Sequence, residues 1–187
     1  MMEKKIFTEA PLVWIDLEMT GLDIARDVIL EIAVVLTDSQ LSEIARGPNL
    51  VISHPQHVLD DMDETCTAMH TKSGLTTDVI NSTVSLKSAQ EQVIKFLKEH
   101  CRSGQSPLCG NSVWQDKIFL TRYMPNIINF LHYRIIDVST IKQLVQCWYP
   151  ASEYKKFQKK EGHRALDDIY ESIDELRWYR QHFFVSK

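Results

Sequence analysis

The sequence predicts one mixed α/β domain, and three observations lead to this class. Short apolar runs rich in β-branched residues, which suit buried strands, occupy the first third of the chain, whereas apolar residues at helical spacing dominate the rest. A length of 187 residues, with 44% hydrophobic and 25% charged residues, fits a single globular unit. No internal repeat, low-complexity run or Gly/Ser linker marks a boundary. We therefore expect one domain over residues 1–187, with its core at about 10–183.

Three strands are predicted early in the chain. Residues 12–15 form a short apolar run after Pro11, residues 29–36 form a second run rich in β-branched side chains, and residues 50–52 follow a Gly-Pro pair. Polar residues follow the first run at its far end, where strands of α/β sheets tend to place ligands. The short separations between the three runs indicate a meander.

Helical periodicity and stop signals define the second half of the chain. Apolar residues recur at helical spacing after Ser85, a favourable N-cap residue, and Pro125 stops a later helix. The expected elements are a helix from Ser85 to near Gly104, an apolar run at 107–109, a helix over 113–124, a buried strand over 134–137, a helix over 139–148 closed by Pro150, and a last helix over 165–183.

Charge, cysteine content and hydropathy exclude several classes of protein. The net charge of −4 disfavours a broad electrostatic grip on duplex nucleic acid but leaves a small anionic ligand open. The four cysteines form no C-x-x-C pair, which argues against a zinc ribbon or a disulfide scaffold. No apolar run approaches the roughly 18 residues of a membrane span, and the amino-terminal residues lack the core of a secretory signal. We expect no membrane partner and a cytoplasmic location, with a mitochondrial form if a leader has been removed.

An acidic pair, Asp16 and Glu18, follows the first predicted strand. Side chains alternate along a strand, so carboxylates at i and i+2 point to the same face and repel each other. Such a tripeptide is most often only a solvated acidic edge. Here the preceding strand is apolar throughout, which favours a central strand whose end opens into a cleft.

Two further acidic residues and one histidine, each considered alone, are explained by ordinary structural roles. Asp116 falls about one helical turn beyond the 107–109 run, where a carboxylate stabilises the start of a helix. His163 and Asp168 are five residues apart, which would turn them about 140° from each other on one helix. His163 is therefore expected in the loop and Asp168 in the first helical turn, where Asp167 and Asp168 also suit capping.

Together, the five residues Asp16, Glu18, Asp116, His163 and Asp168 provide four carboxylates and a base. Four converging carboxylates would be destabilising without cations, and oxygen ligands without thiolates select Mg²⁺ or Mn²⁺ rather than Zn²⁺. Two such ions about 4 Å apart stabilise both the attacking and the leaving oxygen of a phosphoryl transfer. Histidine, which titrates near neutral pH, can deprotonate the attacking water.

This ordered set resembles the three motifs of the histidine-bearing subgroup of the DEDD 3′-to-5′ exonucleases. More closely, the segments WIDLEMTGLD, GNSVWQD, HYRIIDVST and HRALDDI resemble the oligoribonuclease, or small-fragment nuclease, family. The resemblance covers nearly the whole chain. It implies a ribonuclease H-like fold, a five-stranded mixed sheet flanked by helices, and an obligate homodimer. It also implies an enzyme that degrades single-stranded RNA of two to about five nucleotides to nucleoside 5′-monophosphates.

The resemblance also implies roles for particular residues. Leu22 would wedge between the last two bases of the substrate. The 5′-phosphate of a very short substrate would be capped in a closed pocket, with Tyr133 and Arg134 supplied by the opposite protomer. A guanidinium can hold a phosphate bidentately, which agrees with this role. By the resemblance, two divalent metal ions, Mg²⁺ or Mn²⁺, would bind to Asp16, Glu18, Asp116 and Asp168. The catalytic residues would be His163 and Tyr133. The substrate would be bound by Thr20, Gly21, Leu22, His70, Asn111, Ser112, Tyr133, Arg134 and Ser139.

Several of these residues also have plainer readings. Tyr133 and Arg134 suit an ordinary strand edge, Ser139 suits a helix N-cap, and His70 suits a loop or helix end. The lysine-rich run at 155–160 is either a solvent-exposed loop or a positively charged segment that attracts the anionic substrate. The two interpretations are given similar weight.

One position departs from the family pattern. Thr65 stands where relatives carry a tryptophan that lines the base pocket, and stacking of a base on an aromatic ring contributes about 1–3 kcal/mol. Affinity for the 3′ base is therefore expected to be lower unless another aromatic residue substitutes. Trp114 is a candidate, although core or dimer packing is the better interpretation of that residue.

Two other functions compete with the leading hypothesis. A proofreading or DNA-trimming exonuclease would use the same motifs, although 187 residues hold no polymerase or helicase domain. A nonenzymatic dinucleotide-binding module would keep the fold but lose the chemistry. All five catalytic positions are intact in this sequence, which argues against that second alternative.

Overall fold

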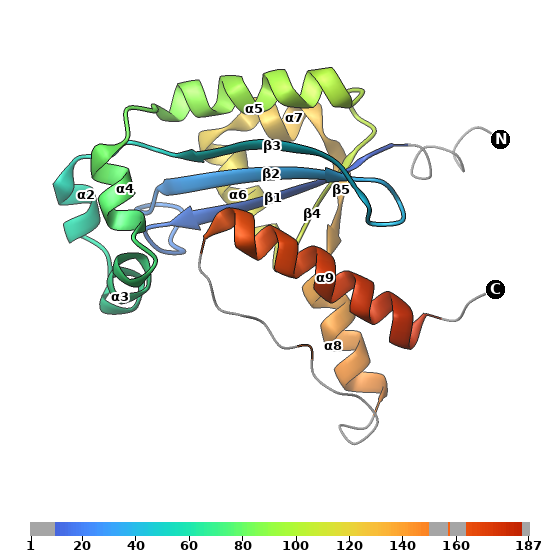
Figure 1. Ribbon diagram of the computed structural model, residues 1–187. Helices are drawn as coiled ribbons and strands as arrows, with labels where there is room; N and C mark the ends of the chain where they lie inside the picture. Colours follow the sequence, from blue (N-terminus) through green and yellow to red (C-terminus); the bar gives the residue numbers. More distant parts are fainter. Residues whose placement is uncertain (1–9, 150–156, 158–163, 185–187) are drawn as a thin grey trace.

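A computed structural model describes residues 10–149, 157 and 164–184, and its centre is a five-stranded mixed sheet (Figure 1). The strands are β1 (Leu12–Met19), β2 (Ile29–Thr37), β3 (Glu43–Val51), β4 (Pro107–Gly110) and β5 (His132–Asp137). In the sheet order β3-β2-β1-β4-β5, the first three strands form an antiparallel meander, and β4 and β5 add in parallel to β1. The predicted meander is confirmed, and β1 is the central strand.

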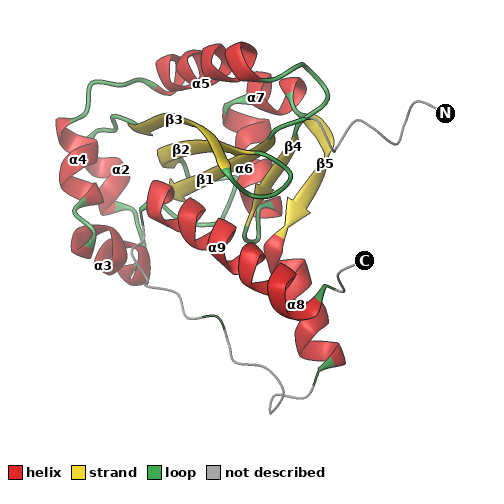
Figure 2. Cartoon of the chain, turned by 45° about the vertical axis from the view of Figure 1, so that its right-hand side comes forward, coloured by secondary structure: helices red, strands yellow, loops and turns green. Residues whose placement is uncertain are grey.

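Helices cover both faces of this sheet (Figures 1 and 2). On one face, α5, α6 and α7 share a hydrophobic cluster with β1 and β2, and on the other face α8 and α9 share a second cluster with the same strands. The short helices α2, α3 and α4 lie beyond the end of β1 (Figure 1). The bounds are α2 (Gln56–Asp60), α3 (Glu64–Lys72), α4 (Leu75–Asn81), α5 (Leu86–His100), α6 (Trp114–Tyr123), α7 (Pro125–Phe130), α8 (Val138–Trp148) and α9 (Ala165–Phe183).

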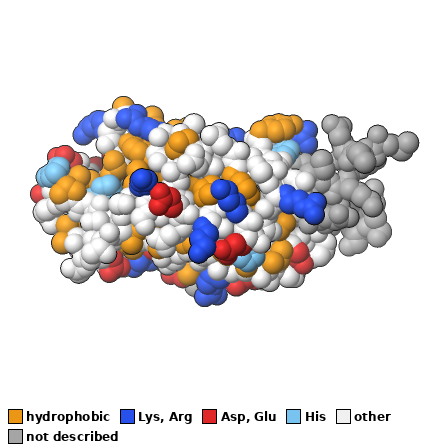
Figure 3. All heavy atoms as spheres, turned by 90° about the horizontal axis from the view of Figure 1, so that it is seen from above, with side chains coloured by type: hydrophobic (Ala, Val, Ile, Leu, Met, Phe, Trp, Pro, Cys, Tyr) orange, Lys and Arg blue, Asp and Glu red, His pale blue; other side chains and the backbone are white. Residues whose placement is uncertain are grey.

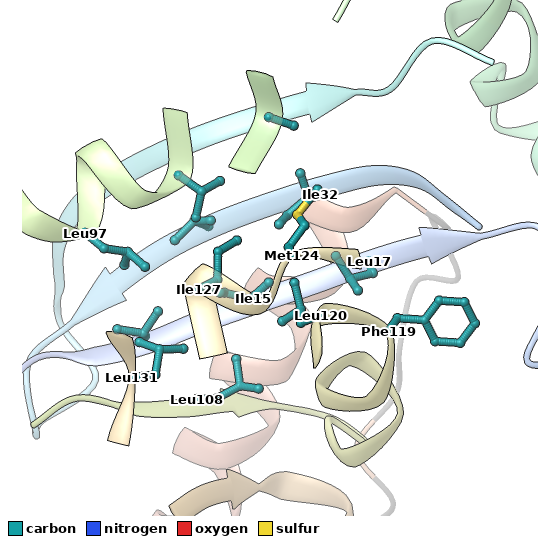
Figure 4. Close-up of a cluster of buried hydrophobic side chains, with 14 of the residues drawn as sticks. Ile15, Leu17, Ile32, Leu97, Leu108, Phe119, Leu120, Met124, Ile127 and Leu131 are labelled. Carbon is teal, nitrogen blue, oxygen red and sulfur yellow. The ribbon is translucent and has the colours of Figure 1, made fainter. Parts of the chain in front are cut away.

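Alternation along β1 divides its side chains between the two layers. Val13, Ile15 and Leu17 belong to the cluster with α5, α6 and α7, of which Figure 4 shows a close-up. Leu12 and Trp14 belong to the cluster with α8 and α9. Because the period of a strand is two, the even-numbered residues that follow continue on the α9 side. The alternation therefore places the last even-numbered side chains of β1 on the face of the sheet that α9 covers.

The third strand is longer than the sequence indicated. The predicted strand covers only 50–52, after Gly47 and Pro48, whereas β3 begins at Glu43 and includes both residues. An edge strand tolerates proline because one side of its backbone has no partner strand, and the pairing with β2 shifts register at this point. Glycine at position 47 makes room for α5, since a Cβ atom there would lie 2.6 Å from the ring of Phe96 and would force that ring to shift.

The predicted helices occur, with one end corrected and several helices added. Ser85 caps α5 as expected, because its side chain accepts a hydrogen bond from Ser88 N–H at 3.2 Å. The prediction that this helix ends near Gly104 was wrong: it ends at His100, and extended backbone at Cys101 breaks it. Pro125 stops α6 and then begins α7. The short helices α2, α3, α4 and α7 were not predicted from the sequence.

The surface over α5 carries mixed charge. Figure 3 looks onto this face and shows Lys and Arg side chains scattered among acidic, apolar and uncharged residues. This face of the described part of the chain therefore presents no continuous basic patch. Among the described residues, no helix combines the length and the apolar character that crossing a membrane requires.

Candidate active site

Three acidic side chains meet where the end of β1 faces the start of α9 (Figures 1 and 2). Asp16 and Glu18 continue the β1 row on the α9 side, and Asp168 lies in the first turn of α9. One ligand atom from each of the three carboxylates lies within 4.8 Å of the others. This acidic cluster, defined as Asp16, Glu18 and Asp168, joins residues about 150 positions apart in the sequence.

The fourth predicted carboxylate lies beside the acidic cluster. Asp116 is in the first turn of α6 and is buried, with 7% of its surface exposed. Its Oδ1 accepts a hydrogen bond from the backbone N–H of Leu17 at 3.0 Å, which attaches α6 to β1 between the two acidic residues of that strand. Asp116 is not a member of the three-residue cluster, but its charge acts on Glu18.

Burial and mutual repulsion make the ionised form of this site unfavourable without a cation. The pKa of Glu18 rises to about 8, first because the group is buried and then because the charges of Asp168, Glu31 and Asp116 oppose its ionisation. The pKa of Asp116 rises to about 7, mainly through burial, with the charge of Asp137 adding to the effect. A divalent cation relieves this repulsion, and a donor set of carboxylate oxygens suits a hard cation. The residues present therefore fit a divalent metal ion.

Divalent metal is expected to stabilise the fold more at pH 8 than at pH 6. The pKa values of Glu18 and Asp116 are raised from ordinary values of 4.5 and 3.8, so the native apo protein keeps protons that the unfolded chain has released. The stability contributed by these groups is full below the ordinary values and is lost as pH rises through about 7 to 8. A bound cation needs the deprotonated carboxylates, so at pH 6 it must first displace protons.

Thermal unfolding with Mn²⁺ and with a chelator, at both pH values, measures this difference. The metal-induced rise in Tm should be larger at pH 8. A rise that is larger at pH 6 would contradict the assignment of raised pKa values to the metal-binding carboxylates.

A buried ion pair that the sequence analysis missed holds the start of α9. Arg164 donates from Nε and Nη2 to the Glu31 carboxylate at 3.0–3.3 Å, and the N–H of Ala165 donates to the same carboxylate at 3.2 Å. Arg164 also pairs with Asp78 of α4 at 3.0 Å. Glu31 is fully buried and lies opposite Glu18 in the β1–β2 register. A single glutamate inside the apolar 29–36 run was the available signal.

His70 lies against the end of β1. It occupies the last turn of α3, is completely buried, and places Nε2 2.8 Å from the carbonyl oxygen of Met19. A carbonyl only accepts, so Nε2 carries the proton. Nδ1 then lies 3.9 Å from Glu18 Oε2, beside the acidic cluster. The helix-end reading of this histidine is correct, and its predicted contact with substrate remains a prediction.

The turn that follows β1 presents an exposed leucine. Thr20 Oγ1 donates to Asp27 Oδ1 at 2.9 Å, and this carboxylate also closes the turn through Asp23 N–H at 2.8 Å. A Cβ atom on Gly21 would lie 2.5 Å from the Asp27 carboxylate, so a larger residue would displace the carboxylate that closes the turn. Leu22, held through its carbonyl by the Gln115 side chain, is 69% exposed. Its predicted role as a wedge between bases remains a prediction.

The structure brings Asn111, Ser112 and Ser139 together in one hydrogen-bonded group, in which Ser112 and Ser139 are called the serine pair. Ser139 Oγ donates to Asn111 Oδ1 at 3.1 Å and accepts from the backbone N–H of Ser112 at 2.9 Å, and the two serine hydroxyls are 3.1 Å apart. Ser112 has φ of +51°, a left-handed conformation that costs a non-glycine residue about 1–3 kcal/mol. The N-cap reading of Ser139 was wrong, because the carboxylate of Asp137 caps α8.

The remaining predicted residues lie at the β5 edge or outside the described part of the chain. Tyr133 and Arg134 are exposed on β5, with the guanidinium 5.3 Å from the centre of the Tyr133 ring. His163 and the lysines of the 155–160 run lie outside the described residues. Thr65 is exposed on α3, and Trp114 is 54% exposed at the start of α6, so packing in the core is excluded for Trp114.

The comparison with protein families decides the classification. The family RNase_T, described as exonuclease, matches residues 13–176. The chain belongs to this exonuclease family. Its relatives include the oligoribonuclease of Hydrogenovibrio crunogenus, which is 51% identical over 180 residues, 96% of this chain and 97% of that protein. The mitochondrial oligoribonuclease of Homo sapiens is 51% identical over 177 residues, 94% of this chain and 74% of that protein.

Solved structures of exonuclease I share this fold. Exonuclease I from Methylocaldum szegediense superposes with a TM-score of 0.71 at 15% identity, over 93% of this chain and 41% of that chain. Exonuclease I of E. coli in complex with a 5cy-dT13 oligonucleotide gives a TM-score of 0.70 at 13% identity, over 93% and 41%. This chain thus spans about two fifths of the length of those proteins. The ribonuclease H-like fold and the resemblance to oligoribonucleases are both confirmed.

Proposed function

We propose that this protein is a 3′-to-5′ exoribonuclease that converts single-stranded RNA of two to about five nucleotides into nucleoside 5′-monophosphates. The observation that carries the proposal is the acidic cluster at the junction of β1 and α9, with Asp116 of α6 hydrogen-bonded to the backbone of β1 beside it. Relatives named oligoribonuclease, 51% identical over nearly the whole chain, supply the substrate class.

The proposed cofactor is a pair of divalent ions, Mg²⁺ or Mn²⁺, held by Asp16, Glu18, Asp116 and Asp168. Bound there, the ions supply Lewis-acid stabilisation of the charge that develops on the phosphodiester oxygens. The raised pKa values of Glu18 and Asp116 support this role, because the charged groups named as acting on them among the described residues are other carboxylates, whose repulsion a cation relieves.

In this proposal His163 is the general base, and the remaining predicted residues bind and orient the substrate. His163 takes a proton from water as the water oxygen bonds to phosphorus, and the bond between phosphorus and the 3′ oxygen of the preceding nucleotide breaks. The products are a nucleoside 5′-monophosphate and a chain shortened by one residue. Leu22 separates the last two bases, His70 and Thr20 line the 3′ site with Gly21, and the serine pair with Arg134 and Tyr133 closes the 5′ end.

We also propose that the enzyme acts as a homodimer in which Tyr133 and Arg134 serve the site of the partner. Large apolar side chains are exposed on α6, β5 and α8, the elements that flank the serine pair: Trp114, Ile118, Tyr133, Leu144 and Trp148. Such residues support an interface between subunits.

Mixing inactive variants tests the shared site. If Arg134 acts in the partner's site, Arg134→Ala and Asp168→Asn should be inactive alone, whereas randomly mixed dimers should recover about a quarter of wild-type activity, since half the dimers are mixed and each has one complete site. Steady-state turnover of a dinucleotide after mixing at equal concentrations measures the recovery. No recovery in verified mixed dimers would place Arg134 in its own protomer's site.

We propose a cytoplasmic location, with a mitochondrial form as the alternative. Both are supported by relatives of equal identity, a bacterial protein and the mitochondrial oligoribonuclease of Homo sapiens. Fractionation of cells that express the tagged full-length protein distinguishes the two.

Incubation of 5′-labelled RNA and DNA tetramers with Mg²⁺ tests the proposed reaction. The RNA should shorten stepwise from its 3′ end, faster than the DNA, and a chelator should stop the reaction. Immediate release of the labelled 5′ nucleotide would contradict the polarity, and faster loss of DNA would favour the DNA-trimming alternative. Tight binding without turnover would favour a dinucleotide-binding module.

A further inference from the structure

A row of buried polar side chains lies behind the serine pair, in the otherwise apolar cluster between the sheet and α9. Glu175, Ser172 and Tyr179 on α9 are 1%, 2% and 3% exposed. None of the motifs in the sequence analysis includes them. A buried carboxylate is unfavourable unless donors surround it, so its position between apolar neighbours calls for a reason.

These side chains fix the orientation of Asn111. Asn111 Nδ2 donates to Glu175 Oε2 and to Ser172 Oγ, both at 2.9 Å, and the Tyr179 hydroxyl donates to Glu175 Oε1 at 3.2 Å. A carboxylate only accepts hydrogen bonds, so the amide nitrogen of Asn111 must face α9 and its oxygen must face away. The reversed amide would place two acceptors in contact in the buried interior.

The orientation of Asn111 in turn fixes the serine pair. Because Asn111 Oδ1 faces outward, the Ser139 hydroxyl donates to it at 3.1 Å, and Ser139 Oγ is left to accept the backbone N–H of Ser112. This contact, together with a second one from the Ser112 N–H to Asp137 Oδ1 at 3.0 Å, holds Ser112 in its left-handed conformation at the surface. A strained residue persists only where its surroundings determine it, and here the connection runs from buried Glu175 to exposed Ser112.

We propose that Glu175 is a positioning residue that sets the preference of the enzyme for a 5′-phosphate, acting through Asn111 on Ser139 and Ser112. The inference rests on the proposed function, in which the serine pair meets the 5′ end of the substrate. Glu175 does not touch the substrate. It holds the donors of the serine pair in place, so its loss weakens recognition of the phosphate more than it weakens the chemistry at the acidic cluster.

The test compares a dinucleotide that carries a 5′-phosphate with the same dinucleotide that carries a 5′-hydroxyl. In Glu175→Met, which keeps side-chain length but removes the acceptors, the ratio of kcat/KM for the two substrates should fall by roughly tenfold or more, mainly through KM of the phosphorylated substrate. Glu175→Gln is the matched control, because its amide oxygen still accepts from Asn111 and its amide nitrogen can donate to Tyr179. Its ratio should stay within about threefold of wild type.

The outcomes separate this inference from the proposed function. An equal loss of kcat/KM on both substrates in Glu175→Met would show a merely structural role and overturn the inference, while the exonuclease assignment would stand. A wild-type enzyme that ignores the 5′-phosphate would overturn both the inference and the phosphate-capping part of the proposed function. If Glu175→Met does not fold, Asn111→Ala breaks the same connection at its other end, and its ratio should fall in the same direction. An unchanged ratio in that variant would also overturn the inference.

Discussion

Asp168→Asn is expected to lower kcat by at least roughly three orders of magnitude, which corresponds to about 4 kcal/mol of transition-state stabilisation. The carboxylate of Asp168 belongs to the acidic cluster, and a neutral amide cannot supply an anionic oxygen to the metal ions. The substitution also removes one of the charges that raise the pKa of Glu18. The apo variant should therefore unfold at the same Tm as wild type or higher, and the rise in Tm on adding Mn²⁺ should shrink.

Asp167→Asn is the matched control for this result. Asp167 is the preceding residue in the same first turn of α9, but its side chain is exposed and it is not part of the acidic cluster. Both substitutions remove the same favourable charge from the start of the helix, an effect of about 0.3–1 kcal/mol. Turnover of a dinucleotide and thermal unfolding should separate the two variants. Similar activities in both would remove Asp168 from the proposed metal site.

His163→Ala is expected to lower kcat by roughly 10²- to 10⁴-fold, the usual contribution of a general base. Metal-dependent binding of a dinucleotide should survive, because the base acts on water and need not contact the metal ions. Single-turnover rates and binding in Mn²⁺ measure the two effects separately. His57→Ala, at an exposed histidine of α2, controls for loss of an imidazole elsewhere.

Loss of metal-dependent binding in His163→Ala would contradict the assignment of this residue as a base. Wild-type kcat would contradict it as well, since another group would then have to take the proton from water.

The sequence predicted the centre of the fold because the signals there are local. An apolar run that ends in Asp16 and Glu18 is enough to predict a central strand with two carboxylates on one face. β3 was predicted too short, since Gly47 and Pro48 resemble a turn, and only the position of the strand at the sheet edge explains why they are tolerated. The short helices α2, α3 and α4 have too few turns to show a period.

The candidate site likewise has a part that the sequence predicts and a part that it does not. The acidic cluster and Asp116 follow from spacing and from the family resemblance, but their supporting contacts join residues far apart in the chain. Glu31 pairs with Arg164 across 133 positions, and Asn111 meets Glu175 across 64. The periodicity of apolar residues along the sequence does not indicate contacts between residues so far apart. The choice of Asp137 over Ser139 as the cap of α8 was likewise open in the sequence, because both residue types cap helices and backbone geometry decides between them.

The most direct measurement is a time course on 5′-labelled RNAs of two, three, five and twenty nucleotides, with Mg²⁺ or Mn²⁺ and with a chelator control. The proposed function predicts rapid, chelator-sensitive conversion of the shortest RNAs while the twenty-mer remains nearly intact, because a closed pocket at the 5′ end excludes longer chains. Equal shortening of all four lengths would contradict the closed pocket. Absence of any cleavage would contradict the exoribonuclease itself.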